Sequence, residues 1–108
     1  MGKDLFVSRL CDVYGALLTQ HRREILRDYY DDDLSLAEIA ENNGITRQAA
    51  LCSIKQAEKQ LRTYEEALGV VAMSDKIESG ISAALELIDN DAKEAKRTLA
   101  RLLTEIGR

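Results

Sequence analysis

Residues 34–61 constrain the fold of this chain more than any other segment, because they carry the start and stop signals of two adjacent helices. Ser35 followed by Glu38 has the spacing of a capping box at a helix N-terminus. Gly44 tolerates the positive φ that a tight turn requires. Thr46 can cap a second helix, whose apolar face is spaced at i, i+4, i+7 and i+11. That face consists of Ala50, Ile54, Ala57 and Leu61. The segment predicts a helix-turn-helix.

The composition favours an all-α domain around this motif. The chain has 108 residues, no proline and six glycines, so few residues interrupt a helix. Apolar residues at helical spacing predict an earlier helix at residues 3–18 and another from residue 20 to about residue 31, capped by Thr19. The first stripe is Phe6, Leu10, Val13, Tyr14 and Leu17; the second is Ile25, Leu26, Tyr29 and Tyr30. We therefore expect an all-α, helix-turn-helix core of about four helices over residues 1–68.

Residues 69–108 carry two further amphipathic stretches. Ser74 is a candidate N-cap for the first, and Asp91 with Glu94 forms a capping-box pattern at the second. The predicted stripes are Ile77, Ile81, Ala84, Leu85 and Ile88, then Ala95, Leu99, Leu102, Leu103 and Ile106. This pattern predicts a C-terminal helical hairpin, with one continuous helix through residues 89–91 as the alternative.

An isolated two-helix hairpin buries its apolar stripes poorly, so residues 69–108 are predicted to be a docking or dimerisation appendage. The stripes can be covered by the first four helices, by a second copy or by a partner protein. Closed two-fold dimers are the commonest oligomers, which favours a homodimer. Residues 63–90 hold one lysine against six acids and residues 91–108 are mildly basic, which favours charge pairing between the arms of the hairpin.

Several classes of protein are disfavoured by the residues that the chain lacks. The two cysteines are far apart, outside any C-x-x-C pair, and the chain has a single histidine. We therefore expect reduced thiols, a cytoplasmic location, and neither a metal nor another cofactor. The apolar run at residues 68–73 is too short to span a bilayer, so no membrane association is expected. Neither a glycine-rich phosphate loop nor a nucleophile elbow is present, which argues against an enzyme.

The exposed face of the second motif helix is the candidate nucleic-acid site. In a helix-turn-helix this helix lies in the major groove, with its first residues at base edges. An arginine at position 47 can bind guanine and a glutamine at position 48 can bind adenine. Lysines further along, with arginines of the preceding helix, can contact phosphates. The predicted nucleic-acid-binding residues are Arg47, Gln48, Lys55, Lys59, Arg22 and Arg27.

Two features favour a protein partner instead of a nucleic acid. Leu51 and Cys52 place apolar groups in the middle of the face that should read bases, a pattern typical of protein-binding surfaces. The net charge is −4, and residues 20–62 hold seven basic and eight acidic side chains, whereas phosphate binding needs an excess of cations. Leu51 and Cys52 are therefore candidate partner-binding residues, unless they pack under the C-terminal hairpin.

The motifs also resemble known families. Residues 20–62 are similar to region 4 of bacterial sigma factors. About residues 5–68 resemble the YlxM family of small bacterial helix-turn-helix proteins. The segments that carry this closer resemblance are Tyr14-Gly-Ala-Leu-Leu-Thr, Tyr29-Tyr30-Asp-Asp-Asp-Leu-Ser-Leu-Ala-Glu-Ile-Ala-Glu, Gly44-Ile-Thr-Arg-Gln-Ala, Ile54-Lys and Tyr64-Glu-Glu.

The resemblance implies a cytosolic, non-catalytic regulator. Genes of the YlxM family are commonly found beside that of the signal recognition particle protein, which implies a role in that targeting pathway, with the particle's RNA and its protein components as candidate partners. By position, Arg47, Gln48 and Lys55 match the polar contact residues of the family's second motif helix. Two functions are thus expected: a nucleic-acid-binding regulator, or a protein-interaction adaptor that keeps the fold without reading a DNA sequence.

Overall fold

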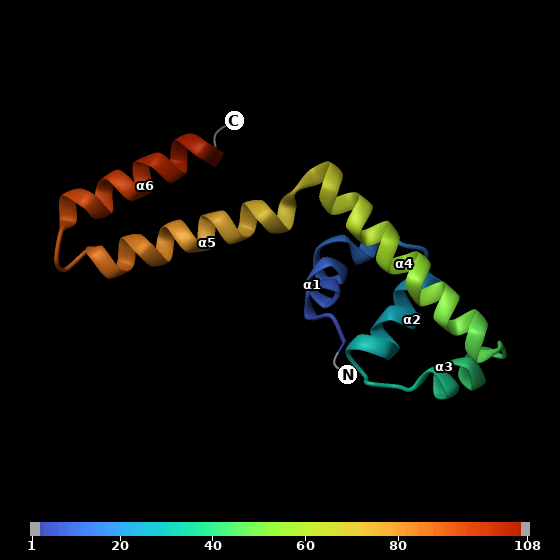
Figure 1. Cartoon of the computed structure of the whole chain (residues 1–108). Helices are drawn as coiled ribbons and strands as arrows, with labels where there is room; N and C mark the ends of the chain where they lie inside the picture. The colour runs from blue at the N-terminus through green and yellow to red at the C-terminus, as the bar shows by residue number, and fades with distance from the viewer. Residues whose placement is uncertain (1–2, 107–108) are drawn as a thin grey trace. The chain divides into compact units, whose positions relative to one another are not determined.

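The computed structural model describes residues 3–106, and this part of the chain is all-α, as predicted. It divides into two compact units, Met1–Leu68 and Gly69–Arg108. The helices are shown in Figure 1. Their bounds are α1 (Leu5–Tyr14), the 3-10 turn η1 (Gly15–Leu17), α2 (Gln20–Tyr30), α3 (Leu36–Asn43), α4 (Arg47–Leu68), α5 (Val70–Leu87) and α6 (Ala92–Ile106).

The first unit is built around the apolar stripe of α4. Four side chains of this stripe are at most 1% exposed, and α1, α2 and α3 each pack against α4 (Figure 1). The four are the predicted Ala50, Ile54, Ala57 and Leu61. Alanine at two of these positions lets the neighbouring helices approach closely. The large side chains that complete the core are Val7, Leu10, Ile25, Leu26 and Ile39.

The turn between α3 and α4 has the predicted geometry. The Ser35 hydroxyl accepts a hydrogen bond from the Glu38 amide at 3.1 Å, and the Glu38 carboxylate accepts one from the Ser35 amide at 3.0 Å. The helix ends at Gly44, which has φ 64°. Thr46 then caps α4, because its hydroxyl accepts from the Ala49 amide at 3.0 Å. The helix-turn-helix is confirmed.

The first helix is shorter than predicted and presents a different face. It begins after Asp4, whose carboxylate accepts from the Phe6 amide, and it ends at Tyr14, where the chain tightens into η1. The expectation that Phe6, Val13 and Leu17 face inward was wrong, since their side chains are 38%, 43% and 55% exposed. Val7 is buried instead, because it shares the i, i+3, i+7 spacing of the buried Leu10 and Tyr14.

Residues 70–106 form the predicted hairpin, in which α5 and α6 pack side by side (Figure 1). The turn at residues 88–91 excludes the alternative of one continuous helix. Ser74 does not cap α5, because the helix already begins at Val70, directly after Gly69 with φ 62°. Asp91 does cap α6 by accepting from the Glu94 amide, but no return bond completes the box within residues 3–106, and the Glu94 carboxylate lies 3.2 Å from Arg97.

The predicted stripes of the hairpin are only partly buried. Ala84, Ala95 and Leu102 are buried, as expected. The remaining large side chains of the stripes are exposed or half-buried, because α5 turns a neighbouring face towards α6. Those exposed are Ile81, Leu85, Ile88, Leu99 and Leu103.

The left-handed conformation of Gly44 gives a direct test of the motif. A Cβ at this position would meet no atom within 4 Å, so a substitution changes only the backbone preference. We expect Gly44→Ala to lower the free energy of unfolding by roughly 1–2 kcal/mol. Gly44→Asn should cost clearly less, because asparagine tolerates a positive φ. Urea unfolding followed by circular dichroism measures both, and equal losses of stability for the two variants would contradict the turn described here.

Candidate nucleic-acid interface

The outward face of α4 is strongly biased towards positive charge. Arg47, Lys55, Lys59 and Arg62 are exposed, whereas Glu66 is the one exposed carboxylate on this helix. Residues 47–57 contain no acidic side chain at all. The near-neutral charge count over residues 20–62 therefore conceals a local excess of cations on the exposed side of α4.

The other two carboxylates of α4 are turned towards neighbouring helices. The Tyr30 hydroxyl donates to Glu58 Oε1 at 2.8 Å, and the Tyr14 hydroxyl donates to Glu65 Oε1 at 2.5 Å. Both glutamates are half-buried. Burial, together with the Glu58 carboxylate, holds the pKa of the Tyr30 hydroxyl well above its ordinary value, so this hydroxyl stays protonated and remains a donor.

The cations of this face differ in whether the fold already engages them. Within residues 3–106, the side chains of Arg47, Lys55 and Lys59 make no hydrogen bond or ion pair. In contrast, Arg62 pairs with Asp4 at 2.8 Å, and this arginine lowers the pKa of the Asp4 carboxyl. The three unengaged side chains are available to an anionic partner.

Arg22 lies elsewhere than the sequence suggested. It was expected to face outward, yet it is half-buried, and its guanidinium donates to Gln60 Oε1 and to Gln56 Oε1, each at 2.9 Å. This arginine fastens α2 to α4. It also lines a surface hollow of about 340 Å³ together with Lys59. Arg22 therefore lies beside Lys59, a predicted contact residue, but its guanidinium is used to hold α2 against α4.

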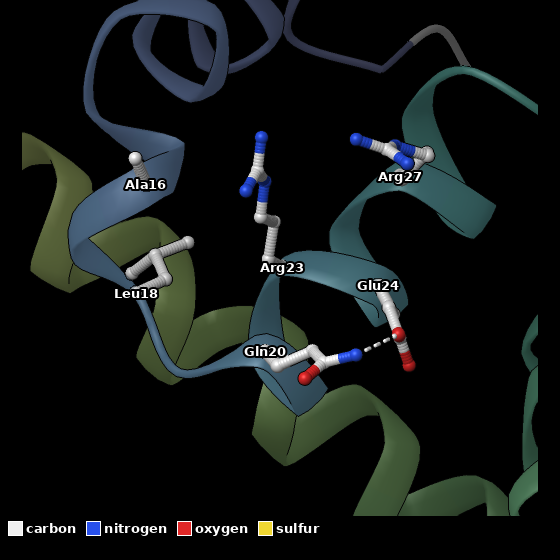
Figure 2. Close-up of a pocket in the computed structure, with 6 residues that line it drawn as sticks. All are labelled: Ala16, Leu18, Gln20, Arg23, Glu24 and Arg27. Carbon is white, nitrogen blue, oxygen red and sulfur yellow. Dashed lines mark hydrogen bonds between the residues drawn. The ribbon is translucent and has the colours of Figure 1, made fainter.

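Arg27 occupies a different hollow from the cations of α4. Figure 2 shows Arg27 and Arg23 extending from α2 into a space of about 410 Å³, which Leu18 and Ala16 line from the preceding segment. Gln20 and Glu24 also line this hollow, and Gln20 Nε2 donates a hydrogen bond to Glu24 Oε1 at 3.1 Å (Figure 2). Arg23 is one of the arginines of the preceding helix that were expected to face outward, and the structure places its exposed side chain with Arg27 in this hollow.

The start of α4 combines polar and apolar groups in one hollow. Arg47, Gln48 and Leu51 line it, with Leu36 of α3 opposite, and its volume is about 520 Å³. Leu51 is half-buried there, whereas Cys52 is exposed. The apolar pair predicted from the sequence is therefore split, since only Leu51 is partly covered.

The two thiols lie in different environments. Cys11 is half-buried on α1. Burial raises the pKa of the Cys11 thiol, and the Asp31 and Asp12 carboxylates raise it further, against the opposing effect of Arg23 and Arg27. In the described part of the chain, no three histidine, cysteine or acidic side chains are grouped as metal ligands would be.

Within residues 3–106, none of the helices is both long enough and apolar enough to cross a bilayer.

The fold and the exposed face of α4 together define a helix-turn-helix protein. Comparison with known proteins gives the same class: the UPF0122 family model, described as "Putative helix-turn-helix protein, YlxM / p13 like", matches residues 1–102. The chain belongs to this family. The predicted resemblance to the YlxM family is confirmed, whereas the similarity to sigma factor region 4 stays a prediction.

Relatives in several bacteria match most of the chain. UPF0122 protein STH1464 of Symbiobacterium thermophilum is 40% identical over 100 residues, which are 92% of this chain and 94% of that protein. A UPF0122 protein of Clostridium botulinum is 48% identical over 80 residues, covering 74% and 73% of the two chains. The family therefore extends over both the helix-turn-helix unit and most of the hairpin.

The environments of the two thiols predict a difference in reactivity. We expect iodoacetamide at pH 8 to alkylate Cys52 faster than Cys11, because Cys52 is exposed whereas burial both shields Cys11 and raises the pKa of its thiol, which lowers the fraction of reactive thiolate. The single-thiol variants Cys11→Ser and Cys52→Ser, followed by mass spectrometry, measure each rate separately. Equal rates would contradict the half-buried position of Cys11.

Proposed function

We propose that this protein is a non-enzymatic, nucleic-acid-binding regulatory protein whose contact surface is the outward face of α4. One observation carries the proposal: four exposed cations stand against one exposed carboxylate on this helix, and three of the cations are unengaged within residues 3–106. Phosphate binding needs such a local excess, even in a chain whose net charge is −4.

The order of side chains along α4 suits a helix that enters a groove by its N-terminus. Arg47 and Gln48 stand in the first turn, where a helix-turn-helix contacts base edges. Arginine pairs with guanine and glutamine with adenine. The amide groups at the start of α4, next to Thr46, can donate to a phosphate.

Later turns of α4 supply sequence-independent contacts. Lys55, Lys59 and Arg62 line a hollow of about 360 Å³, together with Glu58 and Glu66. Ammonium groups at this spacing can follow a phosphate backbone without reading bases. Arg22 stiffens the same region by binding Gln56 and Gln60. We infer that affinity comes mainly from the lysines and that discrimination between bases comes from the first turn.

The family resemblance extends the proposal to a pathway. The YlxM-like motifs imply action in the signal recognition particle pathway, in the cytoplasm, and make the particle's RNA a ligand to test beside duplex DNA. Structured RNA presents a phosphate density similar to that of DNA, so the same lysines can serve either ligand. Duplex DNA and the particle's RNA are therefore tested as two separate ligands in one binding experiment.

Neutralising the unengaged cations should weaken binding and its dependence on salt. We expect the triple variant Arg47→Ala/Lys55→Ala/Lys59→Ala to lower affinity at least about 100-fold at low salt. For a duplex, we also expect it to reduce the slope of log affinity against log salt by about 0.9 for each phosphate that the variant no longer binds. Fluorescence anisotropy at several salt concentrations, on duplex DNA and on the particle's RNA, measures both quantities.

The matched control is Lys93→Ala, which removes an exposed lysine of α6 and should leave affinity within about twofold. Circular dichroism should show that every variant keeps its helix content. Negligible binding of the unmodified protein to both ligands at low salt would contradict the proposal. Binding that the triple variant retains in full would contradict the assignment to α4.

A second candidate function rests on the exposed Cys52 and the half-buried Leu51 on the same face. An apolar centre within a charged rim suits a protein-interaction adaptor that uses the motif without reading bases. The variant Leu51→Asp separates the two functions. The adaptor is favoured if Leu51→Asp abolishes binding to purified protein components of the signal recognition particle while Arg47→Ala has little effect and neither nucleic acid binds.

A further inference from the structure

The hairpin exposes two rows of large apolar side chains. On α5, Ile81, Leu85 and Ile88 are 45%, 64% and 54% exposed. On α6, Leu99 and Leu103 are 44% and 68% exposed. Scattered exposed apolar residues need no explanation, but five large ones at helical spacing on a two-helix unit mark an uncovered surface.

These rows are distinct from the rows that hold the hairpin together. A Cβ on Gly80 would lie 2.7 Å from Leu102 Cδ2, so α5 and α6 meet closely at these two residues. Ala84 and Ala95 are buried in the same seam, at 4% and 3% exposure. Intramolecular packing of the hairpin thus sets Leu102 against small residues of α5 and leaves a separate row of larger apolar side chains exposed on each helix.

The two exposed rows lie on the same face of the hairpin. On each helix, the exposed row comes one position after the packed row along the sequence, as Ile81 follows Gly80 and Leu103 follows Leu102. One position along an α-helix is a rotation of about 100° around the helix axis, so the exposed row is rotated in the same sense from the packed row on both helices. Because α5 and α6 run in opposite directions, equal rotations bring both rows to one side. We call this surface the apolar face, defined by Ile81, Leu85, Ile88, Leu99 and Leu103.

Charges beside the apolar face are segregated by helix. From residue 78 to residue 90 the chain has three acidic residues and no basic one. At the start of α6, Lys93 and Lys96 are exposed and make no ion pair within residues 3–106. The acidic residues Glu78, Glu86 and Asp89 are exposed too. Towards the turn, α5 is therefore acidic, whereas the start of α6 presents two unengaged lysines beside the capping Asp91 and beside Glu94, which pairs with Arg97.

We propose that the apolar face pairs with the same face of a second copy, which makes the protein a homodimer with a four-helix bundle at its centre. If the two-fold axis runs parallel to the helices, α5 of each copy lies on α6 of the other, and acidic arms meet basic arms. The perpendicular two-fold axis would place the turns of the two hairpins at opposite ends, so that the acidic and basic arms would not meet. Charge complementarity therefore selects both the occupant and its orientation. This pairing is independent of nucleic-acid binding.

Sedimentation equilibrium of the full chain tests the pairing. We expect a species of twice the chain mass of 12.1 kDa at micromolar concentration. Leu85→Asp should raise the dissociation constant at least about 100-fold, because it would place a charge in the apolar interface. The matched control is Leu5→Asp, which changes a leucine of α1 that is 79% exposed and should leave the mass unchanged.

Charge reversal gives a second readout that does not depend on the apolar substitution. Glu86→Lys/Asp89→Lys and Lys93→Glu/Lys96→Glu should each weaken self-association at low salt, and mixing the two variants should produce a heterodimer. An unmodified protein that stays monomeric at about 100 μM would overturn the proposal. It would also be overturned if Leu5→Asp dissociates the dimer and Leu85→Asp does not. A monomer that Leu85→Asp destabilises would show that the hairpin docks on its own chain.

Discussion

The burial of one stripe on α4 is the interaction on which the helix-turn-helix unit depends. Ala50, Ile54, Ala57 and Leu61 are almost fully excluded from solvent, and α1, α2 and α3 all pack on this helix. A single helix that supplies a core stripe on one side must present its opposite side to solvent. The outward side of α4 is thus held in place by the same packing that stabilises the fold, which makes it a rigid surface for a partner.

Hydrogen bonds beside the buried stripe of α4 determine which charged side chains remain on the outward side of this helix. Tyr30 and Tyr14 draw Glu58 and Glu65 towards the neighbouring helices, while Arg47, Lys55 and Lys59 stay available. The chain as a whole is acidic, and most of its net negative charge lies in residues 1–68, outside the outward face of α4. An acidic protein can therefore still carry a local cationic surface.

Local signals in the sequence predicted the positions of the helices well. They did not predict contacts between residues that are far apart in the sequence. Ser35, Gly44 and Thr46 act within a few residues, so their roles follow from spacing alone. The hydrogen bonds from Tyr14 to Glu65 and from Arg22 to the glutamines of α4 join residues more than thirty positions apart. No local sequence pattern predicts such hydrogen bonds. In the hairpin, the packed side of α5 includes Gly80, which a search for large apolar residues does not find. The spacing of apolar residues consequently placed the apolar face in the same predicted stripes as the buried Ala84, Ala95 and Leu102.

Amide NMR of the ¹⁵N-labelled protein tests whether the outward face of α4 binds nucleic acid. On titration with the particle's RNA or duplex DNA, we expect shift changes concentrated at residues 46–59, with those of the buried Ile54 and Ala57 smaller than those of Arg47, Gln48 and Lys55. Shift changes confined to the hairpin, or a spectrum unchanged at saturating nucleic acid, would contradict this expectation.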